Sequence, residues 1–407
     1  MNCRHCGSAI DGYFLDLGFS PPSNAYLSEQ DLRAPELHFP LRVSVCEYCW
    51  LVQTEDFARA DDLFRHDYAY FSSVSRSWLE HASNYSTMIS SLLGLDKNSL
   101  VIEVAANDGY LLKNFVSAGI PCLGIEPTAS TAAAAEEQGI PIRREFFGGA
   151  LAQQLVNEGN RADLIIGNNV YAHVPDINDF TAGLKMVLKP GGVITLEFPH
   201  VMHLIEQAQF DTVYHEHFSY LSLYVVSQIF ARAGLRVWDV EEIATHGGSL
   251  RVFGCHAEDV RTNMPAVSRL LDEEERRGLC KRVTYGALQF QANRVKNDLV
   301  AFLIEQNKAG KSVAAYGAAA KGNTLLNFAG IKPDLLPYVC DAAPSKQGKF
   351  LPGSHIPILP PAVLCERRPD IVLILPWNLA DEVIRQHEYV GKWGGRFVVA
   401  APTLRMY

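Results

Sequence analysis

The chain has 407 residues, of which 48% are hydrophobic and 20% charged, and this composition is that of an ordinary globular protein with two or three domains. Its formal net charge is −9 and it has no basic block, which argues against nucleic acid and against an anionic membrane surface as partners. The N-terminus does not read as a signal peptide and no apolar run approaches the ~20 residues of a membrane span, so we expect a cytoplasmic protein with no membrane partner.

Two Cys-x-x-Cys pairs open the chain, and together they predict a structural zinc site in a first domain over residues 1–75. Short knuckles of this kind present two thiolates each to one ion. The gap between the pairs is longer than usual, so the intervening segment with Pro21 and Pro22 is expected to be a loop or a hairpin insert. Unrelated thiols or a redox pair are the alternative, although a redox pair normally follows a strand. The predicted metal ligands are Cys3, Cys6, Cys46 and Cys49.

An aromatic and polar segment, residues 64–73, follows the cysteine pairs and precedes a predicted helix that ends near Leu93. An aromatic hinge of this sort often covers a pocket. Tyr68 and Tyr70 are therefore candidates for substrate contacts, with ordinary packing as the alternative.

The second domain, predicted over residues 76–255, begins with an apolar strand that runs through a turn into a helix, as in a doubly wound sheet. The next strand ends in Glu126, at the position where this fold binds ribose hydroxyls. The Gly-x-Gly-x-x-Gly fingerprint is missing, because Ala105, Ala106 and Asn107 occupy the turn. NAD is therefore disfavoured against a cofactor without a phosphate.

Tyr214-His215-Glu216-His217 places four proton-handling side chains in consecutive positions. In an extended chain alternate residues share a face, whereas a loop brings three of them together. Such a group can remove a proton, orient the base and stabilise an oxyanion, which is the set that acid–base chemistry at carbon requires. A metal site or a polar turn is the alternative; a zinc-protease motif is excluded because Ser219 stands where its second histidine belongs.

Residues 256–308 are predicted to be a helical linker, with the charged run 272–277 as a solvated face. A third domain, residues 309–407, repeats the strand, small-residue turn and helix, and later strands complete a smaller parallel sheet. Backbone N–H groups at the helix start, with Tyr316 before it and Lys321 in it, favour an anion site over plain turn chemistry.

Two further motifs carry a resemblance: residues 162–176, which contain Asn-Val-Tyr-Ala-His-Val-Pro-Asp, and Leu188-Lys-Pro-Gly-Gly192 before another strand. They resemble class I S-adenosylmethionine-dependent methyltransferases, which are α/β Rossmann-like proteins. The resemblance implies that the first loop faces the methionine end, Glu126 the ribose, the 144–147 turn the adenine, and two asparagines the sulfonium. The implied cofactor residues are Glu103, Ala105, Asn107, Gly109, Glu126, Phe146, Asn168 and Asn169.

The order of the parts narrows the resemblance. A four-cysteine lobe, a methyltransferase core with Asn-Asp-Gly, the Tyr-His-Glu-His run, His246-Gly-Gly-Ser-Leu-Arg251 and a further α/β lobe are together similar to the sugar carbon-3 C-methyltransferases, which act on nucleotide-linked 4-keto-deoxysugars. In that family the zinc is structural and proton abstraction falls on the His and Tyr of the run. The implied catalytic residues here are His217, Tyr214 and Glu216.

We therefore expect methyl transfer from S-adenosylmethionine to carbon 3 of a nucleotide-linked 4-ketohexose, with dTDP as the first candidate nucleotide, through an enolate. The sugar would lie at the mouth of the second domain, with its diphosphate toward the third. The expected substrate contacts are Tyr68, Tyr70, His173, His246, Arg251, Tyr316 and Lys321. The alternatives are an O- or N-methyltransferase of another small metabolite and a non-catalytic, zinc-dependent assembly protein.

Overall fold

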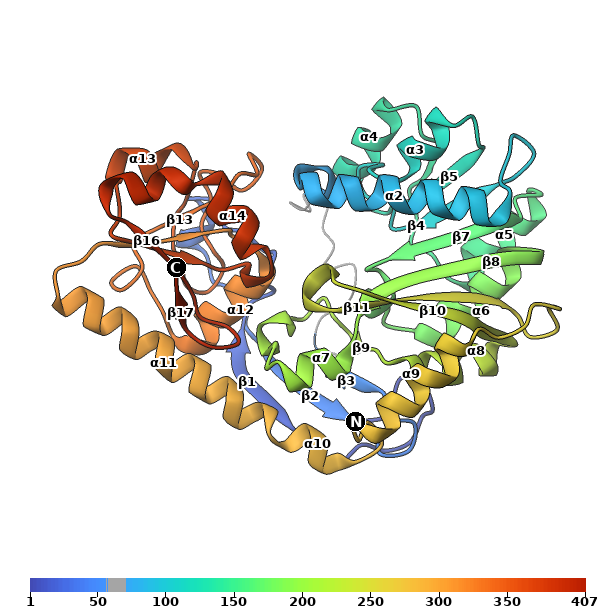
Figure 1. Ribbon diagram of the computed structural model, residues 1–407, viewed down its shortest axis with the longest axis horizontal. Coiled ribbons are helices and arrows are strands. Elements are labelled where there is room, and N and C mark those ends of the chain that lie inside the picture. The colour runs from blue at the N-terminus through green and yellow to red at the C-terminus, as the bar shows by residue number, and fades with distance from the viewer. Residues whose placement is uncertain (56, 58–70) are drawn as a thin grey trace.

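The computed structural model describes residues 1–55, 57 and 71–407. Three sheets make up the fold (Figure 1): one near the N-terminus, one in the middle of the chain and one near the C-terminus. Tyr68 and Tyr70 lie outside the described residues. Across the described part of the chain, no helix combines the length and the apolar character needed to cross a membrane.

The first sheet is antiparallel and has the order β1-β2-β3-β9. Its first three strands are β1 (Leu15–Ser20), β2 (Phe39–Val45) and β3 (Val52–Thr54). The fourth strand, β9 (Ser219–Tyr220), comes from far along the chain and pairs with β3. Because β9 directly follows the Tyr214–His217 run, that run is attached to the sheet of the cysteine-containing lobe.

The middle sheet has seven strands in the order β10-β11-β8-β7-β4-β5-β6. Five are parallel: β4 (Val101–Val104), β5 (Cys122–Ile125), β6 (Ile142–Arg143), β7 (Ala162–Asn168) and β8 (Leu188–Pro199). The hairpin β10 (Leu235–Ile243) and β11 (Ser249–His256) is antiparallel and closes one edge. The sequence predicted this doubly wound architecture, and the prediction is confirmed.

Helices and short 3-10 turns connect the strands of the middle sheet. The α-helices are α2 (Arg76–Leu93), α3 (Leu112–Ser117), α4 (Ala129–Glu137), α5 (Gly149–Asn157), α6 (Ile177–Val187), α7 (Val201–Glu206) and α8 (Leu223–Ala233). The 3-10 turns are η2 (Ser72–Val74), η3 (Tyr171–His173), η4 (Phe210–Thr212) and η5 (Thr245–Gly247).

Three helices, α9 (Pro265–Arg276), α10 (Arg282–Gly286) and α11 (Leu288–Lys308), lead to the third sheet. The prediction of a fully solvated face over residues 272–277 is wrong for Glu274, which is completely buried. Glu274 shares a helix face with Val267 and Leu270, and its carboxylate accepts hydrogen bonds from two backbone N–H groups at the start of α8. A carboxylate at a helix N-terminus is a favourable partner for those otherwise unpaired groups.

The third sheet has the order β14-β13-β12-β15-β16-β17. The strands β12 (Val313–Tyr316), β13 (Val339–Cys340), β14 (Ile358–Leu359), β15 (Ile371–Ile374) and β16 (Arg396–Val399) are parallel, as predicted, and β17 (Arg405–Met406) adds an antiparallel edge. The helical elements of this lobe are α12 (Ala320–Ala329), α13 (Ala362–Arg367), η6 (Trp377–Leu379), α14 (Ala380–Gln386) and η7 (Glu388–Trp393).

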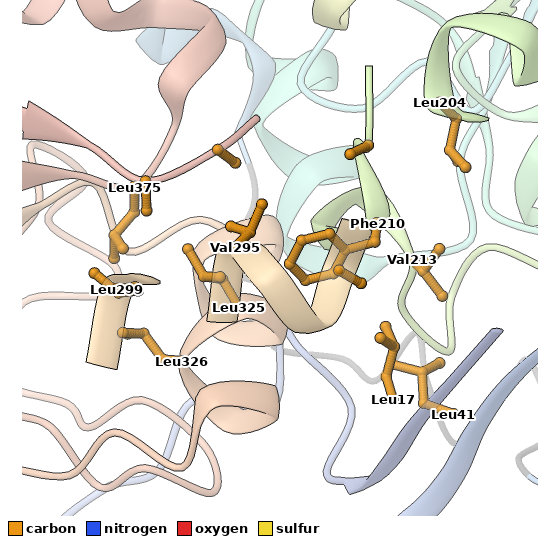
Figure 2. Packing of buried hydrophobic residues seen from close by; sticks show 14 of the residues in the cluster. Leu17, Leu41, Leu204, Phe210, Val213, Val295, Leu299, Leu325, Leu326 and Leu375 are labelled. Carbon is orange, nitrogen blue, oxygen red and sulfur yellow. The ribbon is translucent and has the colours of Figure 1, made fainter. Parts of the chain in front are cut away.

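One buried apolar cluster joins the lobes (Figure 2). It contains leucines of β1 and β2, residues of η4, α11 and α12, and Leu375 after β15. Phe210 in η4 packs against Phe328 in α12, with ring centroids 5.6 Å apart. The segment that precedes the Tyr214–His217 run is thus held in the core where the first, middle and third lobes meet.

Candidate active site and metal centre

The four predicted metal ligands converge. The Sγ atoms of Cys3, Cys6, Cys46 and Cys49 all lie within 4.8 Å of one another. Two of the separations are 3.5 Å and 3.6 Å, close to the ~3.8 Å that tetrahedral Zn–S bonds of about 2.3 Å require. The residues therefore fit a Zn²⁺ ion with four thiolate ligands and no open position, and the predicted zinc site is confirmed.

The two knuckles share a local geometry. In each, the carbonyl of the first cysteine accepts a hydrogen bond from the residue four positions later, Gly7 or Trp50. Both of these residues have left-handed backbone conformations. The repeated turn directs both thiols of a pair to one point, which is why the Cys-x-x-Cys spacing was informative.

The metal lobe holds the candidate catalytic loop. Thr54 at the end of β3 donates its hydroxyl to the carbonyl of His217 at 2.9 Å, and its N–H donates to the carbonyl of Phe218 at 3.2 Å. Arg4, between two zinc ligands in sequence, donates to the Thr54 carbonyl at 3.0 Å. A short chain of hydrogen bonds therefore connects the zinc knuckle to the backbone of His217.

The Tyr214–His217 run is a loop that brings its two ends together. The rings of Tyr214 and His217 have centroids 3.9 Å apart, and the ring of His173 lies 4.6 Å from that of His217. His217 Nδ1 donates to the carbonyl of Thr212 at 3.0 Å, which leaves Nε2 as the basic nitrogen. His215 points elsewhere, toward the carbonyl of Pro40.

The electrostatic surroundings keep His217 neutral. Burial lowers the pKa of His217 well below its ordinary value, and the neighbouring His173, His246 and Lys321 lower it further. Burial also lowers the pKa of His173 to about 4, against a hydrogen bond to the backbone of Glu216 that raises it. A buried, neutral imidazole with one fixed N–H is suited to accept a proton.

Glu216 faces the first lobe. Its Oε1 accepts hydrogen bonds from the backbone N–H and the side-chain amide of Asn24, both at 3.2 Å. Burial raises the pKa of Glu216, and within the described residues its Oε2 has no partner. Asn24 follows the two prolines that the sequence placed in a loop or insert, so this segment forms a wall of the candidate site.

The carboxyl edge of β4 carries the predicted cofactor loop. Ala105 and Asn107 both have left-handed backbone conformations, with φ of 59° and 50°. Gly109 also has a positive φ, and a Cβ there would lie 2.3 Å from Ile140 Cδ1, so only glycine fits. This tight turn brings Glu103 and Asp108 to the same edge.

Buried carboxylate oxygens at this edge lack partners. Within the described residues, both oxygens of Glu103 and Oδ1 of Asp108 make no hydrogen bond. Burial raises the pKa of Glu103 well above its ordinary value, and the negative charges of Glu126 and Asp108 raise it further. A cationic ligand with N–H donors would pair these groups, and the ammonium and sulfonium of S-adenosylmethionine are such a ligand.

Two other predicted cofactor residues have contrasting surroundings. The carboxylate of Glu126 accepts hydrogen bonds from the Asn107 N–H at 2.9 Å and from the backbone and hydroxyl of Thr128. Phe146 is 48% exposed, whereas the adjacent Phe147 packs against Phe180. Of the two phenylalanines, Phe146 is therefore the one free to contact an adenine.

Asn168 and Asn169 lie at the end of β7. Asn168 is buried, and in the part of the chain that the structure describes neither its amide oxygen nor its nitrogen has a partner. Asn169 has a left-handed backbone and donates from Nδ2 to His246 Nε2 at 3.3 Å. His246 is left-handed as well, and burial lowers its pKa to about 4, with a further contribution from Lys321.

Arg251 lies inside the middle sheet. It forms ion pairs with Glu197 at 3.1 Å and Glu241 at 2.9 Å, and its guanidinium lies over the ring of Tyr85. The same Glu197 carboxylate also contacts His81 at 2.9 Å. The contact of Arg251 with substrate stays a prediction. In the structure, these ion pairs give the Arg251 side chain a role in stabilising the middle sheet.

In the turn before α12 one backbone N–H is occupied by a carboxylate of the same lobe, and the predicted anion site there stays a prediction. The carboxylate of Asp341 accepts the Ala318 N–H at 2.7 Å and the Ala343 N–H at 2.8 Å. Tyr316 packs on His387, with ring centroids 4.3 Å apart, inside the third lobe. Lys321 lies on the side of α12 that faces η4 of the middle lobe, and its Nζ bonds to Asn378 of its own lobe.

Sequence reasoning missed three residues that the structure brings to this place. They are Asn24, Asp211 and Trp377. Asp211 follows the fully buried Phe210, and a charged residue beside a buried aromatic was a usable signal. Trp377 and Asn378 come three and four residues after the end of the buried strand β15, at the edge where parallel sheets bind ligands.

Three family models match the chain in succession. "Putative zinc binding domain" matches residues 3–64, "Methyltransferase domain" residues 78–240 and "C-methyltransferase C-terminal domain" residues 244–402. A curated relative, "C-methyltransferase NovU" of Streptomyces niveus, is 34% identical over 404 residues, which is 99% of this chain and 96% of the relative.

Solved methyltransferase structures resemble parts of the chain. One is an S-adenosylmethionine-dependent methyltransferase of Clostridium acetobutylicum, with 11% identity and a TM-score of 0.36, over 43% of this chain and 91% of that one. Another is magnesium protoporphyrin IX methyltransferase of Synechocystis with bound SAM, with 15% identity and a TM-score of 0.33, over 44% of this chain and 80% of that one.

Proposed function

The chain belongs to the S-adenosylmethionine-dependent C-methyltransferases, and from that premise we propose that it methylates carbon 3 of a nucleotide-linked 4-keto-deoxyhexose, with dTDP as the first nucleotide to test. Membership in this family makes carbon the acceptor atom and removes the O- or N-methyltransferase and assembly-protein alternatives. The observation that carries the proposal is the neutral, buried imidazole of His217, whose Nδ1 is fixed by the Thr212 carbonyl.

A 4-keto group makes the neighbouring C3–H acidic, because the resulting charge spreads onto the ketone oxygen. His217 Nε2 takes this proton, the C3–H electron pair becomes the C3–C4 double bond, and the former carbonyl electrons move to oxygen. The product is an enolate and a protonated His217. Tyr214, in ring contact with His217, is placed to hydrogen-bond to the base or to the enolate oxygen.

The cofactor would be held by the residues at the carboxyl edge of the middle sheet. Glu103 and Asp108 offer unpaired carboxylate oxygens to its ammonium group, and Asn168 offers an unpaired amide within the described residues. When bound, S-adenosylmethionine supplies an electrophilic methyl group for carbon 3 and leaves as S-adenosylhomocysteine. Glu126 keeps the loop in place through the Asn107 N–H.

Glu216 acts here on the loop and not on the imidazole. Its carboxylate accepts two hydrogen bonds from Asn24 of the first lobe, so this carboxylate fixes the loop between Tyr214 and His217 from outside. We include it as a positioning residue. The zinc lobe in this proposal is the scaffold that carries both Asn24 and Thr54.

The test is hydrogen exchange at carbon 3. The enzyme is incubated in deuterated water with a 4-ketosugar nucleotide and S-adenosylhomocysteine, without a methyl donor. We expect loss of the carbon-3 proton to solvent and, after addition of S-adenosylmethionine, a gain of one methyl group by mass spectrometry. Methyl transfer to another atom, or no exchange with any 4-ketosugar nucleotide, contradicts the proposal.

A further inference from the structure

Lys321 reaches from the third lobe into the neighbourhood of the base. It is the second residue of α12, a helix that packs against η4 of the middle lobe. Its Nζ lies 2.6 Å from Asn378 Oδ1 and 4.8 Å from the centre of the Trp377 ring. Trp377 Nε1 in turn donates to Asp211 Oδ2 at 2.7 Å, three residues before Tyr214.

This arrangement is fixed from both lobes. Trp377 lies directly against Gly247, where a Cβ would come within 2.6 Å of the Trp377 ring. Gly247 is the neighbour of His246, and Asp211 is completely buried in η4. The ammonium of Lys321 is therefore held between η4, η5 and η6.

The positive charge of Lys321 shifts the pKa values of the groups around it. It lowers the pKa of His217 and of His246, while Asp211 opposes the effect of burial on the pKa of Lys321 itself. Burial raises the pKa of Asp211 to about 6, and Lys321 and the Trp377 N–H act in the opposite direction. Lys321 is thus a cation within electrostatic reach of the base, and Asp211 lies beside it.

An ammonium group has three N–H donors. Of these, the part of the chain that the structure describes accepts one, at Asn378. Lys321 is partly buried, so its remaining donors are open to an acceptor that the bound state provides. The enolate oxygen that forms beside His217 is an acceptor of the required charge.

We propose that Lys321 is a catalytic residue that donates a hydrogen bond from its ammonium group to the 4-keto oxygen of the substrate and stabilises the enolate formed when His217 removes the carbon-3 proton. The inference rests on the proposed function and assigns Lys321 to the reacting oxygen in place of the diphosphate. Asn378 and the Trp377 face orient the ammonium, and Asp211 positions Trp377. No proton leaves Lys321 in this step, so the ketone re-forms as the carbon–carbon bond is made.

The experiment replaces Lys321 with methionine, which keeps the length of the side chain and removes its charge. Carbon-3 exchange in deuterated water, with S-adenosylhomocysteine bound and no methyl donor, should slow by a factor of about 10²–10³, as when one oxyanion donor is removed. The Kd for S-adenosylhomocysteine and the KM for the sugar nucleotide should change by less than about threefold. Lys332→Met, at a third-lobe lysine bonded to the Gly353 carbonyl, is the matched control and should exchange at the wild-type rate.

The pH profile tests separately whether the charge of Lys321 acts on the base. The groups that face His217 are His173, His246 and Lys321, with Asp211 beside Lys321. Removing the lysine charge raises the pKa of His217, so the acidic limb of kcat/KM should move to higher pH in Lys321→Met. Asp211→Asn keeps an acceptor for the Trp377 N–H. Because burial raises the pKa of Asp211 to about 6, this carboxyl is already largely protonated at the pH where His217 titrates, so the substitution should leave the acidic limb in place.

The outcomes are distinguishable. Wild-type exchange with an unimpaired Lys321→Met overturns this inference, and an unaltered exchange rate with a raised KM returns Lys321 to the diphosphate. Absence of exchange in the wild-type enzyme instead overturns the proposed function. If Lys321→Met does not fold, Lys321→Gln is measured in the same exchange assay: slowed carbon-3 exchange with binding of both ligands retained supports the inference, and exchange at the wild-type rate overturns it.

Discussion

The two parallel sheets use the same strand–turn–helix element in opposite ways. At the edge of the middle sheet, the carboxylates of Glu103 and Asp108 are buried with unpaired oxygens among the described residues. At the edge of the third sheet, the carboxylate of Asp341 is saturated by two backbone N–H groups, with Lys346 Nζ 3.5 Å away. The edge of the middle sheet therefore offers unpaired carboxylate oxygens to a cationic ligand. At the edge of the third sheet, the Asp341 carboxylate already has its partners, and Lys321 in the following helix lies toward the middle lobe.

One segment of the zinc lobe joins the candidate catalytic loop to the edge of the third sheet. Asn24 bonds to Glu216 in that loop, and Tyr26 two residues later donates to the Ala318 carbonyl at the third sheet. Ser23 contacts Thr324 of α12 in the same segment. Because this short stretch touches both the loop and the third sheet, the placement of one against the other depends on the integrity of the zinc lobe.

Removing zinc should therefore have the largest effect. We expect about one zinc per chain by metal analysis, and for Cys49→Ser a loss of zinc and of stability on the order of 10 kcal/mol in the first lobe, because metal binding and folding are coupled there. Thermal unfolding with metal analysis measures both. Cys365→Ser, at an exposed cysteine outside the centre, is the control and should retain full zinc content. Release of zinc to a chelator with activity intact would show that the lobe does not hold the loop against the third sheet.

Replacing the candidate base, His217, should have the next largest effect, and this effect should be on turnover. His217→Ala should reduce turnover by a factor of about 10²–10⁴, while S-adenosylhomocysteine and the sugar nucleotide still bind, because an interaction of the transition state is removed. Steady-state kinetics and calorimetric titration measure the two quantities. His215→Ala, in the same run but directed at the Pro40 carbonyl, should keep turnover per folded molecule within about threefold. Equal losses of turnover in both variants would mean that turnover depends on the conformation of the loop and not on the His217 imidazole.

Two amide substitutions test directly whether the carboxylates at the two sheet edges differ in their pairing. Glu103→Gln should weaken S-adenosylhomocysteine binding about 10- to 100-fold, since a charge-assisted hydrogen bond contributes about 1.5–3 kcal/mol, and it should stabilise the ligand-free protein. Asp341→Asn should do the reverse: it loses about 1–3 kcal/mol of stability and leaves the affinity unchanged. Calorimetry and thermal unfolding on both proteins provide the test. Destabilisation by both substitutions would mean that the two edges are alike.

The sequence predicted the zinc ligands and the two parallel sheets, because each depends on local spacing or on strand order. It left open whether the Tyr214–His217 run is extended or a loop, and the structure shows a loop in which the Tyr214 and His217 rings meet. Cys-x-x-Cys turns and apolar strands followed by small residues are local signals, and the structure bears them out. The run 272–277 shows the limit: its charges indicated a solvated face, yet Glu274 is buried because a helix N-terminus from elsewhere in the chain meets it.

The partners of the site could not be predicted, because they come from segments far apart in sequence. Asn24 lies about 190 residues before Glu216, and Trp377 lies 166 residues after Asp211. Lys321 was assigned to a phosphate on the basis of its own helix. Its actual surroundings are set by the docking of α12 on η4, which no local pattern records.

The smallest expected effect is a difference in the pH dependence of stability. Burial and the nearby carboxylates raise the pKa of Glu103 in the folded protein above its ordinary value of 4.5. Between pH 4.5 and the pKa of Glu103 in the folded protein, the folded state binds more protons than the unfolded state. The contribution of the Glu103 carboxyl to stability is therefore full below pH 4.5 and is lost as the pH rises through its folded pKa. The ligand-free wild type should therefore lose stability relative to Glu103→Gln by at most about 1.4 kcal/mol per pH unit in that window. Bound S-adenosylhomocysteine supplies the missing ammonium partner, so in its presence the wild type should become the more stable of the two. Chemical denaturation of both proteins across pH, with and without S-adenosylhomocysteine, measures this difference in stability. Parallel plots of stability against pH in all conditions would mean that the carboxylates at the edge of the middle sheet are as well paired as Asp341 at the edge of the third.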